Sequence, residues 1–255
     1  MEMTDQYAKT FIHYRSDLRQ RTVVQKLNRF FDIYICTEID EQNMTRDVFL
    51  RPETIAKAQS GVEISASILK TGAVGTWKQP FMGFSKLNSD GSLMNPESKA
   101  AGMAACGGVV RDRLGNIQIA FSKDLGNFGR RGTILAEAIG LKLGLEAAVT
   151  IGIKNLQVET DSRDIFNWII QGFKNIDHIY RQPIQSCRNI LLRHPTWRLF
   201  HIPRTANKLA HQLASMGYKA DGMVVFQDVK DITNTTDQRK VMQIVKEDKK
   251  TMEHW

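Results

Sequence analysis

The sequence predicts an α/β fold in which helices pack on a mixed sheet, and two observations support this prediction. Strand-like segments, either alternating or continuously apolar, occupy residues 84–123 and return at 155–161 and 196–202. Between and after the later strands, apolar residues recur at steps of three and four, which is typical of helices. Three strands in series, followed by alternating helices and strands, favour a sheet with an antiparallel part and a parallel part.

The first three strands are expected to form an antiparallel meander. FSKLNSDG, residues 84–91, alternates in polarity and ends in an Asp-Gly turn signal. AGMAACGGVVR, residues 101–111, is a strand of small apolar residues. DRLGN, residues 112–116, has the composition of a hairpin turn, and IQIAFSK, residues 117–123, completes the meander.

The remaining elements alternate between helix and strand. Residues 133–151 form a strong helix, whose apolar stripe must cover a sheet. NLQVETD is a short strand, after which Ser162 can cap the helix DIFNWIIQG. A helix interrupted by proline is expected over residues 179–192, and TWRLFHI is the last strand. A final helix over residues 206–216 is closed by Gly217.

These elements divide the chain into three parts. Residues 1–83 contain helix-like stretches but no chemical motif, so they form an N-terminal region of unknown role. Residues 84–217 form the predicted α/β domain. Residues 218–255 form a C-terminal tail that is expected to be partly disordered: its apolar patch GMVVFQDV should dock, and its charged end should fray.

The net charge of +8 is concentrated in the predicted domain. Residues 84–217 carry 17 Lys and Arg against 10 Asp and Glu, whereas residues 1–83 have a net charge of +1 and the tail is neutral. A concentrated positive charge attracts polyanions, so nucleic acid is the expected partner, and a merely solvated basic face is the alternative.

The composition also limits where the protein acts. No apolar run approaches the roughly 18 residues that span a bilayer, so no membrane role is expected. The first residues lack an apolar secretory signal, and the three cysteines form no CxxC pair. We therefore expect a protein of the nucleus or cytoplasm and, by default, a monomer.

Asp90, Glu137 and Asp161 are the candidate catalytic and metal-holding residues. Glu137 shares one side of its helix with Ile134 and Leu141, so its carboxylate is expected to point towards the sheet along a buried edge. Buried acids are rare unless they are paired or bind a metal. Asp161 follows a strand, and open α/β sheets place their sites at the carboxyl ends of strands. The alternative roles are a turn residue for Asp90 and a helix cap for Asp161.

Three converging acids would repel one another unless a divalent cation neutralised them. Oxygen ligands with open positions suit Mg²⁺, which keeps waters and shares its coordination shell with substrate phosphate. Two such ions would activate a water and stabilise the leaving oxygen in phosphodiester hydrolysis. The sequence has no GxSxG elbow, P-loop or GxGxxG motif, so acyl transfer, nucleoside triphosphate use and dinucleotide binding lack support.

Five motifs resemble, in this order, the ribonuclease H type 1 domain, in particular its plant branch related to retrotransposon reverse transcriptases. They are KLNSDGS, ACGGVVRDRLGN, LAEAIGLKLGLEAA, VETDS and HIPRTANKLAHQLA, and the resemblance covers residues 84–217. It implies a five-stranded mixed sheet and hydrolysis of the RNA strand of RNA/DNA hybrids with Mg²⁺ or Mn²⁺. On the family pattern, Asp90, Glu137 and Asp161 match the first three acidic ligands.

The last motif departs from the family pattern. Family members read N-x-x-A-D-x-L-A, with the Asp as a fourth acidic ligand, whereas this chain reads NKLAHQLA and has His211 there. Because imidazole is a poor partner for Mg²⁺, a second ion should bind more weakly, Mn²⁺ becomes the alternative, and activity is reduced or absent. Arg204 matches the arginine of a basic loop that, in the resembled family, helps product release or the attacking water.

The candidate substrate-binding residues are Ser92, Arg130, Arg131 and Asn207. An enzyme of this class must read 2′-hydroxyls across a minor groove with short polar side chains and hold phosphates with Lys and Arg. Ordinary surface positions are the alternative for the first three residues, and helix capping is the alternative for Asn207.

These features together favour a metal-dependent endonuclease that acts on the RNA strand of RNA/DNA hybrids. One alternative is a catalytically weak or inactive nucleic-acid-binding module derived from a retroelement. Another is a retroelement remnant with no independent role. The choice depends on His211, because it stands where the fourth acid is expected.

Overall fold

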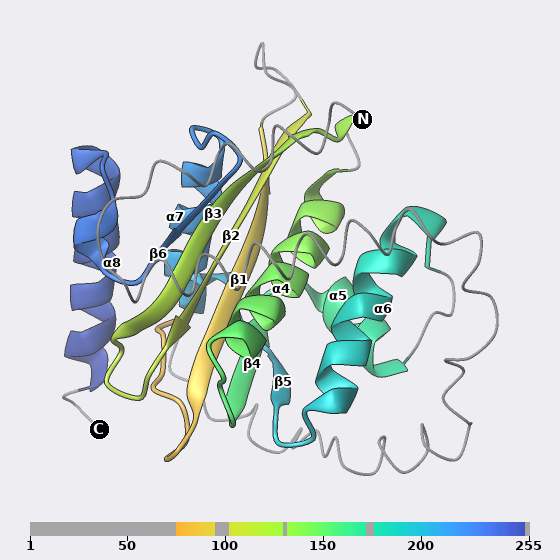
Figure 1. Cartoon of the computed structure of the whole chain (residues 1–255), viewed down its shortest axis with the longest axis horizontal. Helices are drawn as coiled ribbons and strands as arrows, with labels where there is room; N and C mark the ends of the chain where they lie inside the picture. The colour runs from red at the N-terminus through yellow and green to blue at the C-terminus, as the bar shows by residue number, and fades with distance from the viewer. Residues whose placement is uncertain (1–74, 95–101, 130–131, 172–175, 253–255) are drawn as a thin grey trace. The chain divides into compact units, whose positions relative to one another are not determined.

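The computed structural model describes residues 75–94, 102–129, 132–171 and 176–252, all within one compact unit, Ile64–Trp255 (Figure 1). The strands are β1 (Ser85–Leu93), β2 (Met103–Arg111), β3 (Ile117–Asn127), β4 (Leu156–Thr160), β5 (Arg198–His201) and β6 (Met223–Phe226). The helices are α4 (Gly132–Thr150), α5 (Arg163–Gln171), α6 (His178–Arg193), α7 (Lys208–Gly217) and α8 (Thr235–Met252), with short 3₁₀ turns at Arg204–Ala206 and Val229–Asp231. Most of the N-terminal region of residues 1–83 lies outside the described residues, so the structure assigns no role to it.

The strands form one mixed sheet in the order β5-β4-β1-β2-β3-β6. β1, β2 and β3 are a meander of antiparallel neighbours, whereas β4 runs parallel to β1 and β5 parallel to β4. This arrangement confirms the predicted α/β class, with three antiparallel strands followed by parallel ones. The sheet has one strand more than the five expected, because β6 pairs antiparallel with β3 at the far edge.

Glycines in β1 and β2 let a helix approach each face of the sheet. A Cβ at Gly91 would collide with the backbone of α4 at Glu137, and a Cβ at Gly107 would collide with the backbone of α7 at Ala214. Gly107 pairs with Asp90, the neighbour of Gly91, and successive strand residues point to opposite faces, so α4 and α7 cover opposite faces. The Asp-Gly turn expected here is wrong: β1 continues through both residues, because this glycine serves close packing against α4.

Helix α4 is buried along most of its length, because it packs against β1 and β2 of the sheet and also against α6. The predicted stripe is buried at Ala138, Leu141, Leu145 and Ala148, all of which are fully shielded from solvent. Helix α6 continues through Pro183 in its second turn, although the sequence suggested an interruption there. Cys106 and Cys187 are buried free thiols. Across the described ranges, no helix combines the length and apolarity needed to cross a bilayer.

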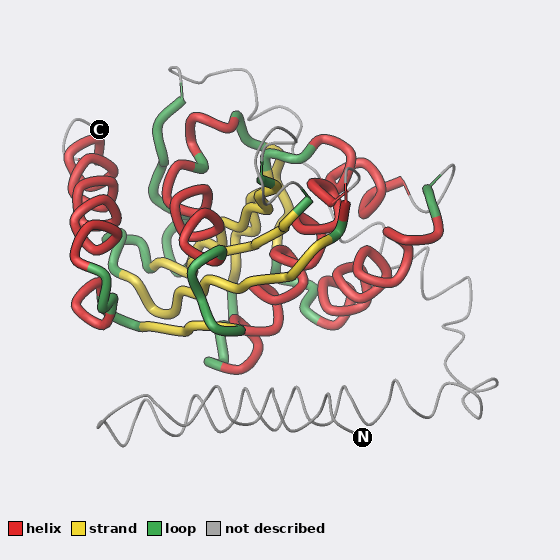
Figure 2. Tube along the Cα trace, turned by 90° about the horizontal axis from the view of Figure 1, so that it is seen from above, coloured by secondary structure: helices red, strands yellow, loops and turns green. Residues whose placement is uncertain are grey.

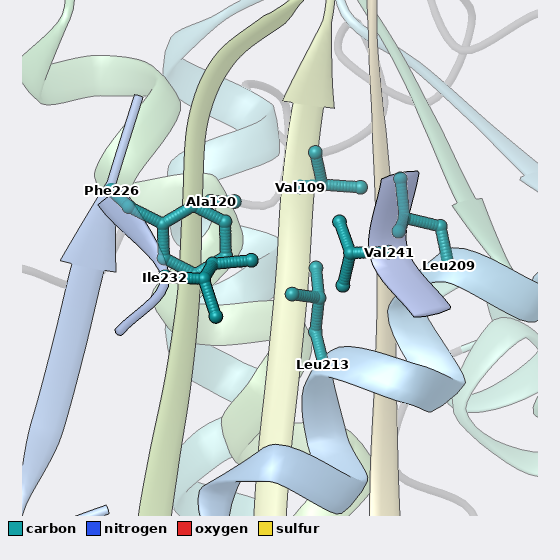
Figure 3. Close-up of a cluster of buried hydrophobic side chains, with 7 residues drawn as sticks. All are labelled: Val109, Ala120, Leu209, Leu213, Phe226, Ile232 and Val241. Atoms are coloured by element: carbon teal, nitrogen blue, oxygen red, sulfur yellow. The ribbon is translucent and has the colours of Figure 1, made fainter. Parts of the chain in front are cut away.

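The C-terminal tail completes the core on the α7 face. Its apolar patch forms β6, and its charged end, which the sequence suggested would fray, forms α8 instead. The reason is that α8 has an apolar side, including Val241, that joins a cluster from four other elements (Figure 3). The buried members of this cluster are Val109, Ala120, Leu209, Leu213, Phe226, Ile232 and Val241. Figures 1 and 2 show α8 along one side of the sheet.

A buried polar cluster of Trp77, Asn88, Arg111 and Asp248 connects α8 and the residues before β1 to the sheet. The Arg111 guanidinium pairs with Asp248 of α8 at 2.7 Å and lies 3.9 Å from the centre of the Trp77 ring. Trp77 Nε1 donates a hydrogen bond to Asn88 Oδ1 at 3.0 Å. Segments on both sides of residues 84–217 are therefore part of the folded unit.

Candidate active site

Asp90 within β1, Asp161 directly after β4 and Glu137 of α4 lie near one another, since their charges interact. Parallel pairing aligns Asn88 with Glu159, and the same register continued by two residues brings Asp161, just after β4, beside Asp90. Glu137 lies in the second turn of α4, where the helix backbone contacts the glycine that follows Asp90. One parallel strand pair and one closely packed helix therefore assemble the three acids.

Burial and the charges of neighbouring carboxylates change the pKa values of Glu137 and Asp161. The pKa of Glu137 is raised to about 7, mainly by burial; a hydrogen bond from Ser162 acts to lower it, and the charges of Asp90 and Asp161 act to raise it. Burial and the charge of Asp90 likewise raise the pKa of Asp161. The three carboxylates therefore share one electrostatic field, and a cation among them would favour the ionised form of each.

His211 contacts Asp90 from the first turn of α7. Its Nδ1 atom lies 2.8 Å from Asp90 Oδ2, and the Gly91 backbone N–H donates to Asp90 Oδ1 at 2.9 Å, so both carboxylate oxygens have a partner. The hydrogen bond with Asp90 raises the pKa of His211, with burial acting in the opposite direction. The His211 side chain is 44% exposed and that of Asp90 is 3% exposed, so the imidazole stands between the acid and the solvent.

Asn207 joins three parts of the site. Its Nδ2 atom donates hydrogen bonds to the backbone oxygen of Ser89 at 2.9 Å and to Asp161 Oδ1 at 3.0 Å. The residue is 1% exposed. The capping role suggested as its alternative is wrong, because the side chain makes no cap hydrogen bond to α7.

The other predicted site residues differ in how the structure places them. Arg204 is exposed, and its charge lowers the pKa values of Glu137 and Asp161, which places it near the acids. Ser92 is half-buried in β1, two residues beyond Asp90. Arg130 and Arg131 lie outside the described residues.

Two residues near the acids were not among the predicted site residues. The Ser162 hydroxyl hydrogen-bonds to Glu137, whereas the sequence favoured Ser162 as a helix cap. Tyr218 lies beside Ser92, and burial together with the charge of Asp90 raises the pKa of its phenol. The position of Ser162 directly after Asp161 was a signal that could have identified it; Tyr218 carried none, because it follows the last motif.

The donor set of the site is that of a hard divalent cation, because it consists of carboxylate oxygens from three elements. The repulsion that raises the pKa values of Glu137 and Asp161 is the cost that such a cation would remove. Among the described residues, no three His, Cys, Asp or Glu side chains are grouped so that they could hold a metal ion without rearrangement. Asp90 and Asp161 are instead held by hydrogen bonds with His211 and Asn207.

Comparisons with known proteins match the segment that contains these residues. Residues 88–217 match the family model described as reverse transcriptase-like. Over 143 residues the chain is 32% identical to an Arabidopsis thaliana protein with a provisional ribonuclease H name, which is 56% of this chain and 22% of that protein. The matched part is thus less than a quarter of that relative's length.

Two solved structures are also similar to this chain. One is ribonuclease H1 from Halobacterium salinarum, with 24% identity and a TM-score of 0.47 over 53% of this chain and 98% of that one. The other is the N-terminal ribonuclease H domain of a Mycobacterium tuberculosis protein, with 20% identity and a TM-score of 0.47 over 54% of this chain and 95% of that one.

Proposed function

Because the chain belongs to the reverse transcriptase-like family of ribonuclease H-like domains, we propose that it is a metal-dependent endonuclease that hydrolyses the RNA strand of RNA/DNA hybrids. The observation that carries the proposal is the convergence of Asp90, Glu137 and Asp161, whose charges act on one another, inside the matched segment. The ribonuclease H name of the Arabidopsis relative supports the same reaction.

The three carboxylates would hold Mg²⁺ or Mn²⁺. A bound divalent cation would supply a more acidic water and stabilise charge on the leaving oxygen. Glu137, with a pKa of about 7, is only partly ionised at neutral pH when no cation is bound. Arg204 is exposed near the acids and is suited to bind a phosphate of the substrate.

Substrate binding is assigned to the basic segment of residues 84–217, which contains 17 Lys and Arg against 10 Asp and Glu. Its positive charge would bind the phosphates of both strands, in a salt-dependent way. Ser92 is suited to read a 2′-hydroxyl because it is a short polar side chain on the same strand as Asp90. Arg130 and Arg131 are proposed phosphate contacts on the basis of their place in the sequence.

A second function is favoured by one contact. His211 Nδ1 lies 2.8 Å from Asp90 Oδ2, and the family pattern has an acid at the position of His211. This contact competes with any cation for Asp90, and a catalytically weak or inactive hybrid-binding module would result if it prevails. Mn²⁺ accepts nitrogen ligands better than Mg²⁺ does, so activity should be greater with Mn²⁺.

The test is cleavage of a labelled RNA/DNA hybrid by the purified full chain in Mg²⁺ and in Mn²⁺, with binding measured by fluorescence anisotropy. We expect Mn²⁺ to support faster cutting, His211→Asp to raise the Mg²⁺ rate, and Asp161→Asn to abolish cutting while hybrid binding persists. Duplex DNA of the same sequence is the control substrate and should stay intact. If neither ion supports cutting by the wild type or by His211→Asp, the nuclease proposal fails, and persistent hybrid binding then supports the binding module.

A further inference from the structure

Asn207 sits at the start of α7 with its amide turned into the protein. The side chain is 1% exposed, so it offers no atom to a substrate that approaches from solvent. Asn207 occupies the N-cap position of α7, because its backbone oxygen accepts a hydrogen bond from the His211 N–H, but its side chain makes no cap hydrogen bond. Burial therefore excludes the substrate-binding role that the sequence suggested for Asn207, and the lack of a side-chain cap bond excludes the capping role.

The orientation of the amide is fixed by what surrounds it. Nδ2 donates to the Ser89 oxygen and to Asp161 Oδ1, while Asn207 Oδ1 is buried without a hydrogen-bond partner. Turning the amide over would place Oδ1 against a carbonyl oxygen and a carboxylate, and both contacts would be repulsive. The side chain therefore keeps one unsatisfied acceptor in order to direct both donors at β1 and Asp161.

Asp161 needs such a donor because of its position. It follows the last residue of β4, so the sheet ladder does not hold it, and the charge of Asp90 repels its carboxylate. The hydrogen bond from Asn207 opposes this repulsion. One turn further along α7, His211 contacts Asp90, so a single helical turn touches both aspartates.

We propose that Asn207 is a positioning residue that fixes the Asp161 carboxylate relative to Asp90, so that both face one cation. This inference rests on the proposed function for the identity of the site. Groups that orient metal-holding side chains change metal affinity by about 10–100-fold when they are removed. Asn207 therefore acts on cation binding without touching the substrate.

The first experiment needs no metal. Asn207→Asp has nearly the same shape but turns an acceptor towards Asp161, so it should lower the unfolding midpoint of the full chain. Adding Asp161→Asn to Asn207→Asp reverses donor and acceptor between these two side chains, so the double variant should recover the part of the loss that comes from this contact, although an acceptor still faces the Ser89 carbonyl. If the change in midpoint of the double variant instead equals the sum of the changes in the two single variants, the two side chains are not coupled and the proposal is overturned.

The second experiment measures Mn²⁺ binding by calorimetric titration. Asn207→Ala should weaken binding by about 10–100-fold and slow hybrid cleavage at saturating substrate, with KM for the hybrid unchanged. Leu209→Ala is the matched control: it lies two residues along the same helix, is also 1% exposed, and faces the core cluster, so it should lower stability but keep Mn²⁺ affinity.

The outcomes separate three roles for Asn207. A raised KM with unchanged Mn²⁺ affinity would make it a substrate contact, and equal losses of affinity in Asn207→Ala and Leu209→Ala would make it merely structural. Both results overturn the proposal. If the wild type neither binds Mn²⁺ nor cuts the hybrid, the proposed nuclease function fails by itself, and the metal-free coupling between Asn207 and Asp161 still decides whether Asn207 positions this carboxylate.

Discussion

Removal of the Asp248 carboxylate should destabilise the whole folded unit, because it leaves the Arg111 guanidinium buried without its charge partner. The two side chains are 1% and 11% exposed, with Arg111 the more buried. Burial lowers the pKa of Arg111 and raises the pKa of Asp248, so their attraction only partly offsets the cost of removing both charges from water.

The magnitude follows from what Arg111 keeps. Breaking a buried pair by removing one partner costs about 3–5 kcal/mol. In Asp248→Ala, Arg111 retains the Trp77 ring at 3.9 Å and the Asn88 oxygen at 3.4 Å, which places the expected loss at the lower end, about 3 kcal/mol. For a unit of this size the loss corresponds to a fall of about 6–12 °C in Tm.

The assay is urea unfolding of the full chain followed by circular dichroism. Lys250→Ala, an exposed change on the same helix, is the control and should stay within about 0.5 kcal/mol of the wild type. Arg111→Met combined with Asp248→Leu should recover most of the lost stability, because apolar residues replace both charges. A loss below about 1 kcal/mol for Asp248→Ala, well under what an uncompensated buried charge costs, would refute the reasoning.

Two further predictions concern α4. Glu146 is 2% exposed with a pKa raised to about 7, so its contribution to stability is full below its ordinary pKa of 4.5 and is lost as the pH rises through 7. Ionisation of Glu146 should lower the unfolding free energy of the wild type by about 3 kcal/mol between pH 4.5 and 8, and Glu146→Gln should remove this decrease. The exposed control Glu247→Gln should keep the decrease. Equal pH profiles for the wild type and Glu146→Gln would contradict the prediction. Gly91→Ala should cost about 3 kcal/mol or more in the same urea assay, because the added Cβ meets the α4 backbone, and a wild-type midpoint would show that the strand and helix can separate freely.

Local pattern was enough to predict most of the elements between residues 84 and 217. The helix of residues 133–151 matches α4, Gly132–Thr150, to within one residue at each end, because its apolar residues repeat over five turns. Pattern failed at Gly91, where Asp-Gly suggested a turn. A glycine is favoured both by turns and by close packing, and only the presence of α4 against the strand distinguishes the two.

The sequence by itself determined the order of strands and helices, the basic charge and the three acids, because periodicity, composition and motifs are properties of neighbouring residues. Only the tertiary structure decided that the charged end of the tail forms a helix that joins the core, that His211 holds Asp90 and that Asn207 faces Asp161. These contacts join residues far apart in the chain: Arg111 and Asp248 are 137 positions apart, and Asp90 and His211 are 121 apart. A local pattern predicts that a residue will be buried, whereas its contact partner in the core depends on how the sheet and the helices pack.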